Sequence, residues 1–168
     1  MSKKALLIGI NRYRVPGADL RGCVNDVDSL RSVLQDKYGF DGSAIATLKD
    51  GEATGAAILR ELEALFSEAA PGDTLVFGYA GHGTRYTDPK DASAVEAIVP
   101  HETTTTAHLV SNAAINAVVR ACMSKRGLAG NANFTAIYDC CHSGLMYRDL
   151  VVNQTVELET GIINRVID

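Results

Sequence analysis

Two short segments carry residue types that are used in nucleophilic catalysis. The segment YAGHGTR places His82 between two glycines, and the segment YDCCHSG contains Cys140, Cys141 and His142. A free thiol with a pKa near ~8.5 is mostly protonated at neutral pH, and a neighbouring imidazole can accept its proton during attack on a carbonyl carbon. The imidazole can then return that proton to a leaving amine. The two segments therefore predict a cysteine–histidine pair, provided that the fold brings them together.

The alternation of side chains along a strand distinguishes the two adjacent cysteines. If the apolar run NFTAIYD before them is a strand, Asp139 and Cys141 point to one face and Cys140 points to the other. Free cysteines commonly pack as small apolar residues. We therefore assign the nucleophile to Cys141, which has the acidic neighbour and the glycine-bearing turn. Cys140 is the alternative nucleophile, and we expect it instead to pack under a helix.

Other interpretations of these residues are weaker. In one interpretation, Cys140 and Cys141 are core residues and His82 caps a helix. A zinc site is another, but three consecutive residues cannot easily converge on one ion, and no second Cys/His pair has zinc-finger spacing, so we predict no metal. His142 is an alternative base, although adjacent side chains usually diverge. His101 and His108 fall in the polar segment HETTTTAH, where we expect solvated side chains.

The chain alternates apolar runs with segments of helical period. The runs predict buried strands at 4–10, 44–48, 74–80 and 133–139, with a weaker one at 95–100. The periodic segments predict helices from the candidate caps Asn25 and Asp26 to Gly39, from Ile58 to Pro71, and from Ser111 to Gly127. This alternation predicts an α/β fold with a mainly parallel sheet covered on both faces. Ligands meet such sheets at the carboxyl ends of the strands, which is where His82 and Cys141 follow.

The composition is that of a soluble globular domain. The chain has 168 residues, of which 46% are hydrophobic and 21% charged, and its net charge is -4 with the basic residues scattered. No basic stripe exists to follow a nucleic-acid backbone, and no apolar run approaches the ~20 residues of a membrane helix. The cysteines show no disulfide framework, which favours a reducing compartment. We therefore expect a cytoplasmic protein without nucleic-acid or membrane partners.

Several motifs occur together in a consistent order. They are KKALLIGINRY, LRGCVNDVDSLRSVL, LVFGYAGHGTR, EAIVP and YDCCHSG, and they extend from residue 3 to about residue 146. In these stretches the chain resembles the caspase-like cysteine peptidases, most closely the metacaspase and prokaryotic orthocaspase branch. The resemblance implies a caspase-like three-layer sandwich. It also implies a catalytic large-subunit domain over 1–150, followed by a tail or intersubunit linker over 151–168.

The resemblance further implies an activity and the residues that carry it. It predicts a cysteine endopeptidase that hydrolyses peptide bonds after Arg or Lys by a dyad of Cys141 and His82. Backbone N–H groups of Gly83 and Cys141 would hold the oxyanion of the tetrahedral intermediate. Asp26 and Asp139 match the two aspartates of the pocket for the residue before the scissile bond, and two carboxylates suit a guanidinium or ammonium group. Asp26 is also a candidate helix cap.

Two alternatives to this activity stay open. Caspases proper use arginines to hold an aspartate, and Arg21 lies near one such position, so cleavage after Asp is the alternative specificity. Caspase-like folds also serve as non-catalytic interaction modules. Both dyad positions are intact in this chain, which counts against the module.

The chain departs from the family pattern in two places. Calcium-dependent metacaspases carry an acidic cluster near the EAIVP segment, where this chain has Ser111 and Asn112, so we expect no cofactor and calcium activation is disfavoured. The family sheet also has small-subunit strands after the cysteine, and only 142–168 follow here. We therefore expect a small-subunit polypeptide to complete the sheet. Arg165 is a candidate self-cleavage point.

Overall fold

The structure is a computed structural model that describes residues 1–88, 90–128 and 132–141. For Cys141 it describes the backbone and not the side chain. The tail predicted over 151–168, together with His142 and Arg165, lies outside the described residues.

Strands and helices alternate along the chain. The strands are β1 (Lys3–Gly9), β2 (Ile45–Lys49), β3 (Thr74–Thr87), β4 (Ala94–Ile98), β5 (Val110–Ser111) and β6 (Asn133–Cys141). The α-helices are α1 (Cys23–Tyr38), α2 (Gly55–Leu65) and α3 (Asn112–Lys125). The single-turn 3-10 helices in the described part of the chain are η1 (Gly42–Ala44), η2 (Asp50–Glu52) and η3 (Thr106–His108). Within the described ranges, no helix is long and apolar enough to cross a membrane.

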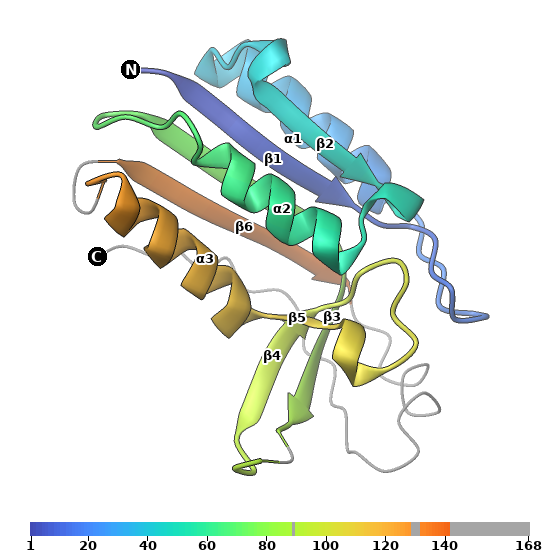
Figure 1. Cartoon of the computed structure of the whole chain (residues 1–168). Coiled ribbons are helices and arrows are strands. Elements are labelled where there is room, and N and C mark those ends of the chain that lie inside the picture. Colours follow the sequence, from blue (N-terminus) through green and yellow to red (C-terminus); the bar gives the residue numbers. More distant parts are fainter. Residues whose placement is uncertain (89, 129–131, 142–168) are drawn as a thin grey trace.

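The central strands form a parallel sheet in the order β2, β1, β3 and β6 (Figure 1). β3 continues beyond this sheet, and its second half pairs antiparallel with β4, which in turn pairs with β5. The predicted α/β class with a mainly parallel sheet is therefore confirmed. The weaker strand predicted at 95–100 exists as β4, but it belongs to the antiparallel extension.

Helices cover both faces of the parallel sheet, which gives the three layers of the predicted sandwich (Figure 1). α1 packs on one face in a buried cluster that includes Cys23, Val27, Leu34, Leu7 and Val76. α2 and α3 pack on the other face in a larger cluster that includes Ile58, Leu62, Ile115, Val119, Leu6 and Phe77. Neighbouring residues of one strand thus face different helices, as the two-residue period of a strand requires.

The first helix begins earlier than predicted. Its N-cap is Gly22, which has a φ of 112° and is followed directly by Cys23. Asn25 and Asp26 lie inside the helix, and no side chain caps it, so the prediction that these two residues cap α1 is wrong. Only glycine adopts such a φ without strain. Gly9 lets the helix approach β1, because a Cβ there would lie 2.9 Å from the Cys23 carbonyl oxygen.

Asp73 ties the start of β3 to the chain segment before β1. Only 4% of the residue is exposed, and its carboxylate accepts hydrogen bonds from the Ser2 hydroxyl (2.7 Å) and the Ala70 N–H (3.0 Å). These bonds, that of the Ser2 hydroxyl first, lower the pKa of Asp73 from 3.8 to about 2. A carboxylate with a depressed pKa stabilises the folded state above its unfolded pKa and loses that contribution as the pH falls through its folded pKa.

We therefore expect Asp73→Asn to lower the free energy of unfolding at pH 7. The difference from the wild type should shrink as the pH falls below 3.8 and through about 2, because the wild-type carboxylate then becomes protonated and loses its charge. Urea denaturation across this pH range measures the effect. Asp36→Asn, at an exposed position of α1, is the control. A loss of the same size at both ends of the range would contradict the assignment.

Candidate active site

The two predicted catalytic motifs lie side by side at one end of the parallel sheet. β3 and β6 pair in parallel from Thr74 with Asn133 to His82 with Cys141. Neighbouring strands lie about 4.8 Å apart, so the backbones of His82 and Cys141 are adjacent although they are distant in sequence. Both residues stand at the carboxyl end of this parallel pair, where ligands of α/β sheets are expected. The side chain of Cys141 is outside the described residues.

The two faces of β6 separate Cys140 from Cys141. Ala136 and Cys140 pack against the core under α2 and α3, whereas Ile137 packs against the core under α1. Cys140 is therefore a packing residue, as the sequence predicts. Because β6 extends to Cys141, strand alternation assigns that position to the α1 face. Residues in register on parallel strands share a face, so His82 belongs to the same face.

The imidazole of His82 is fully buried and has a defined hydrogen-bond partner. Its Nε2 lies 2.9 Å from the carbonyl oxygen of Ala18, in the loop after β1. A carbonyl oxygen only accepts hydrogen bonds, so Nε2 carries a proton and donates it. In the neutral ring the lone pair then lies on Nδ1. Nδ1 is therefore the nitrogen that can accept a proton from a thiol.

Two buried tyrosine hydroxyls hold the backbone of His82. The His82 N–H donates to the Tyr13 hydroxyl (2.9 Å), and the Tyr79 hydroxyl donates to the His82 carbonyl oxygen (2.7 Å). Burial raises the pKa of Tyr79 well above its ordinary value, so its hydroxyl stays protonated. Neither tyrosine is among the candidate site residues predicted from the sequence. For Tyr79 the available signal is that a tyrosine in a buried strand needs a partner for its hydroxyl, whereas Tyr13 lies in the loop after β1 and has no such signal.

The glycines on either side of His82 make room for neighbouring side chains. A Cβ at Gly81 would lie 2.6 Å from the Tyr79 hydroxyl oxygen and 2.8 Å from that of Tyr13. A Cβ at Gly83 would lie 3.2 Å from Sγ of Cys140. These contacts give both glycines a packing role. The oxyanion role of the Gly83 N–H stays a prediction.

We expect Gly81→Ala to destabilise the protein more than Gly83→Ala. Overpacking costs about 1–3 kcal/mol, and the cost at Gly81 should reach about 3 kcal/mol, because two hydroxyls that bond the His82 backbone must move. At Gly83 about 1 kcal/mol is expected, since one thiol can shift by a few tenths of an ångström. Urea denaturation of the two variants measures both losses. Equal losses would contradict this packing account.

The two predicted pocket aspartates are both exposed. Asp26 lies in the first turn of α1, which starts beside the carboxyl end of β1. Asp139 pairs in register with Ala80 of β3, two residues before Cys141. In the part of the chain that the structure describes, neither carboxylate takes part in an ion pair. The pocket role of both aspartates stays a prediction.

Ser111 and Asn112, which stand where calcium-dependent metacaspases carry acidic residues, have structural roles in this chain. Ser111 caps α3 by accepting a hydrogen bond from the Ala114 N–H (3.1 Å), and the Asn112 side-chain amide donates to Glu96 (3.1 Å). Among the described residues, no group of three or more His, Cys, Asp or Glu side chains is arranged to hold a metal ion. The expectation that no cofactor or calcium is needed stays a prediction.

The prediction of a solvated side chain is confirmed for His108, which is exposed, whereas His101 is half-buried and takes part in contacts between two loops. Nδ1 of His101 lies 2.7 Å from the Arg12 carbonyl oxygen, and the His101 carbonyl oxygen accepts from the Arg14 N–H (3.1 Å). Nδ1 of His108 accepts from the Thr104 N–H (3.2 Å). His101 therefore joins the loop after β1 to the segment after β4, a contact that composition alone does not reveal.

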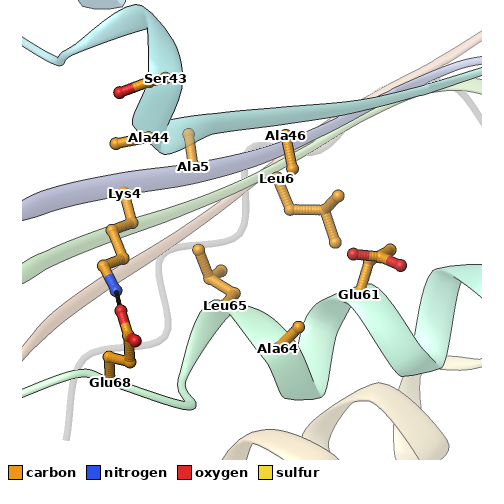
Figure 2. A pocket seen from close by; sticks show the side chains of 10 residues that line it. All are labelled: Lys4, Ala5, Leu6, Ser43, Ala44, Ala46, Glu61, Ala64, Leu65 and Glu68. Carbon is orange, nitrogen blue, oxygen red and sulfur yellow. Dashed lines mark hydrogen bonds and ion pairs between the residues drawn. The ribbon is translucent and has the colours of Figure 1, made fainter.

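A pocket of about 360 Å³ lies at the opposite end of the sheet, near the start of β1 (Figure 2). Its lining includes the apolar side chains of Leu6, Ala46 and Leu65, and the ion pair between Lys4 and Glu68 (3.0 Å). None of the predicted site residues lines it. This pocket is therefore separate from the candidate active site.

Comparison with known proteins adds independent observations. The family model described as metacaspase, peptidase C14 domain, matches residues 3–150. Metacaspase-1 of Scheffersomyces stipitis is 36% identical over 151 residues, which are 84% of this chain and 36% of the relative. Metacaspase-1A of Aspergillus niger is 34% identical over 151 residues, with the same two shares. Metacaspase-1 of Cryptococcus neoformans var. neoformans is 36% identical over 151 residues, 84% of this chain and 32% of the relative. The chain spans about a third of the length of these relatives.

A solved structure has a similar arrangement of strands and helices. The crystal structure of a protein from Geobacter sulfurreducens superposes with a TM-score of 0.64 over 89% of this chain and 54% of that chain. The sequence identity is 21%, so the likeness shows the fold alone.

Proposed function

Because the chain belongs to the metacaspase peptidase C14 family, we propose that it supplies the catalytic large-subunit region of a cysteine endopeptidase. The register of His82 with Cys141 on adjacent parallel strands is the observation that carries the proposal. The two residue types that acyl transfer needs stand next to one another at the carboxyl end of the sheet. Cys140, by contrast, is partly buried and packs against the core under α2 and α3.

In the proposed mechanism, Nδ1 of His82 accepts the proton of the Cys141 thiol, and the thiolate attacks the carbonyl carbon of the scissile bond. The backbone N–H groups of Gly83 and Cys141 stabilise the resulting oxyanion. The imidazolium then donates its proton to the leaving amine, which leaves an acyl-thioester on Cys141. His82 next takes a proton from a water molecule as that water attacks the thioester carbonyl carbon, and it returns the proton to the departing sulfur of Cys141, which releases the carboxyl product. Because Nε2–H donates to the Ala18 carbonyl oxygen, Nδ1 is the ring nitrogen that accepts and donates the proton in each of these steps.

For specificity, the proposal assigns Asp26 and Asp139 to a pocket for an Arg or Lys side chain before the scissile bond. Both carboxylates are exposed and come from elements that meet at the same end of the sheet as His82. Two carboxylates can bind a guanidinium group through paired hydrogen bonds. Arg21 is exposed as well, and its guanidinium group could instead bind an Asp side chain, which is the alternative specificity.

For the assembly, the proposal includes a small-subunit polypeptide that pairs with β6. In the described part of the chain, β6 pairs with β3 alone, and an open strand edge is a template for a further strand. The chain also spans about a third of the length of its metacaspase relatives. A cytoplasmic location fits the spacing of the four cysteines in the sequence, which shows no disulfide framework.

Thiol alkylation distinguishes this proposal from a non-catalytic interaction module. We expect Cys141 to react with iodoacetamide at least about 10-fold faster than Cys122, because a neighbouring imidazole raises the thiolate fraction of a cysteine. The pKa of Cys122 is raised, first by its partial burial and then by Glu63, so it is a slow internal reference. Peptide mapping by mass spectrometry after timed labelling measures both rates in one sample. Equal and slow labelling would favour the module.

A further inference from the structure

β3 changes neighbours at His82. Its pairing with β1 ends at Ala80, and its pairing with β4 begins at Gly83. The His82 carbonyl oxygen accepts a hydrogen bond from the N–H of Val99, the residue that follows β4 (3.0 Å). The His82 N–H lies between the two neighbours, and it donates to the Tyr13 hydroxyl instead of to a strand (2.9 Å). A side chain thus supplies the hydrogen-bond acceptor where the sheet does not.

Tyr13 also contacts the imidazole itself. The two ring centroids are 4.8 Å apart at an interplanar angle of 50°. Tyr13 is buried, with 7% of its surface exposed, so the contact with the His82 ring is shielded from water. One side chain therefore contacts the backbone of His82 through its hydroxyl and the ring of His82 through its aromatic ring.

The loop that carries Tyr13 is itself anchored at several points. The Tyr13 N–H donates to the Asp19 carboxylate (2.9 Å), and the two preceding backbone N–H groups donate to the Asp50 carboxylate (2.7 and 2.9 Å). The same loop provides the Ala18 carbonyl oxygen that holds Nε2 of His82. The Tyr13 hydroxyl and the Ala18 carbonyl, which both bond His82, therefore belong to one anchored loop, and a shift of that loop would displace both groups.

We propose that Tyr13 is a positioning residue that sets the imidazole of His82 for proton exchange with Cys141. This inference rests on the proposed cysteine peptidase function. Without the hydroxyl, the buried His82 N–H has lost its acceptor, and β3 must shift to recover one. Such a shift moves Nε2 relative to the Ala18 carbonyl and Nδ1 relative to the neighbouring strand. Displacements near 1 Å at a reacting group cost up to about 100-fold in rate.

Tyr13→Phe is the informative substitution, because it removes the hydroxyl and keeps the ring that contacts His82. Tyr138→Phe is the matched control. Tyr138 lies on β6 in register with Tyr79, and its ring packs on Phe77 with centroids 5.8 Å apart, so the same atom is removed one strand away. Two readouts in the full-length chain test the proposal: the rate of Cys141 alkylation by iodoacetamide, and the tautomer of His82 from long-range ¹H–¹⁵N NMR.

We expect Tyr13→Phe to slow alkylation of Cys141 about 10-fold, and Tyr138→Phe to change it less than about twofold. The wild type and Tyr138→Phe should show the single Nε2–H tautomer, and Tyr13→Phe should show both tautomers. Thermal unfolding midpoints of the two variants should be similar, which separates positioning from general destabilisation. If Tyr13→Phe matches Tyr138→Phe in alkylation rate and tautomer, the proposal is overturned.

A second variant covers the case in which Tyr13→Phe does not fold. Asp19 is exposed, so Asp19→Ala loosens the Tyr13 backbone without opening the core. About threefold slower Cys141 alkylation with a mixed tautomer supports the proposal, and unchanged values overturn it. A wild-type Cys141 that reacts no faster than Cys122 instead defeats the proposed function. The tautomer measurement then still decides whether Tyr13 orients His82.

Discussion

Cys141→Ala is expected to lower kcat for peptide hydrolysis by at least about 10⁴-fold, because alanine provides no nucleophile for the acyl-enzyme. His82→Gln is expected to lower kcat by about 10²–10⁴-fold, the usual contribution of a general base. Glutamine keeps much of the side-chain volume and an amide that can donate to the Ala18 carbonyl. Fluorogenic peptides, assayed with the complete enzyme at saturating substrate, measure kcat for each variant.

Cys140→Ala is the matched control for this prediction. The Cys140 side chain is partly buried and packs against the core under α2 and α3, so its removal should lower the free energy of unfolding and leave kcat within about threefold of wild type. Hydrolysis that survives both Cys141→Ala and His82→Gln would defeat the dyad. Loss of activity in Cys140→Ala with an active Cys141→Ala would move the nucleophile to Cys140.

Asp26→Asn and Asp139→Asn are each expected to lower kcat/KM for substrates with Arg before the scissile bond by about 30-fold. A hydrogen bond to a charged group contributes about 2 kcal/mol, and each 1.4 kcal/mol is a factor of about ten. Lys substrates should lose activity as well, since they depend on the same carboxylates. Peptides that differ only in an Arg, Lys or Asp residue at this position measure the specificity.

Asp28→Asn is the control for the pocket. Asp28 lies on the same helix as Asp26, but its carboxylate pairs with Lys49 of β2 (2.6 Å). This substitution should change kcat/KM less than about twofold, because exposed ion pairs contribute little. A wild type that prefers Asp before the scissile bond would reject the acidic pocket and favour Arg21, while it leaves the dyad assignment intact.

Much of the fold is predictable because it follows from local apolar patterns. The run at 4–10 corresponds to β1, and the run at 133–139 corresponds to most of β6. The resemblance to metacaspases, drawn from motifs such as YDCCHSG, is confirmed by the family model over residues 3–150. Such motifs are informative because each combines a strand end with the residues that follow it.

The second half of β3 shows where local patterns fail. Residues 81–87 read GHGTRYT, and their glycines and polar side chains indicate a loop. Gly81 and His82 pair with β6 in the parallel sheet, and residues 83–87 form a strand because β4, which follows in the chain, folds back and pairs with them from Gly83 to Thr87. A strand whose hydrogen bonds come from a neighbour outside the parallel sheet has no apolar run of its own.

The sequence by itself determined the class of the fold, the family, and the candidate dyad with Cys141 preferred over Cys140. Each of these depends on residues that are close together in the chain, or on motifs that can be recognised in the sequence without coordinates. Tertiary structure alone decided that His82 pairs with Cys141 in register, that Ala18 holds Nε2, and that the Tyr13 hydroxyl accepts from the His82 backbone. These contacts join segments far apart in the chain through backbone groups, and every residue carries the same backbone donors and acceptors.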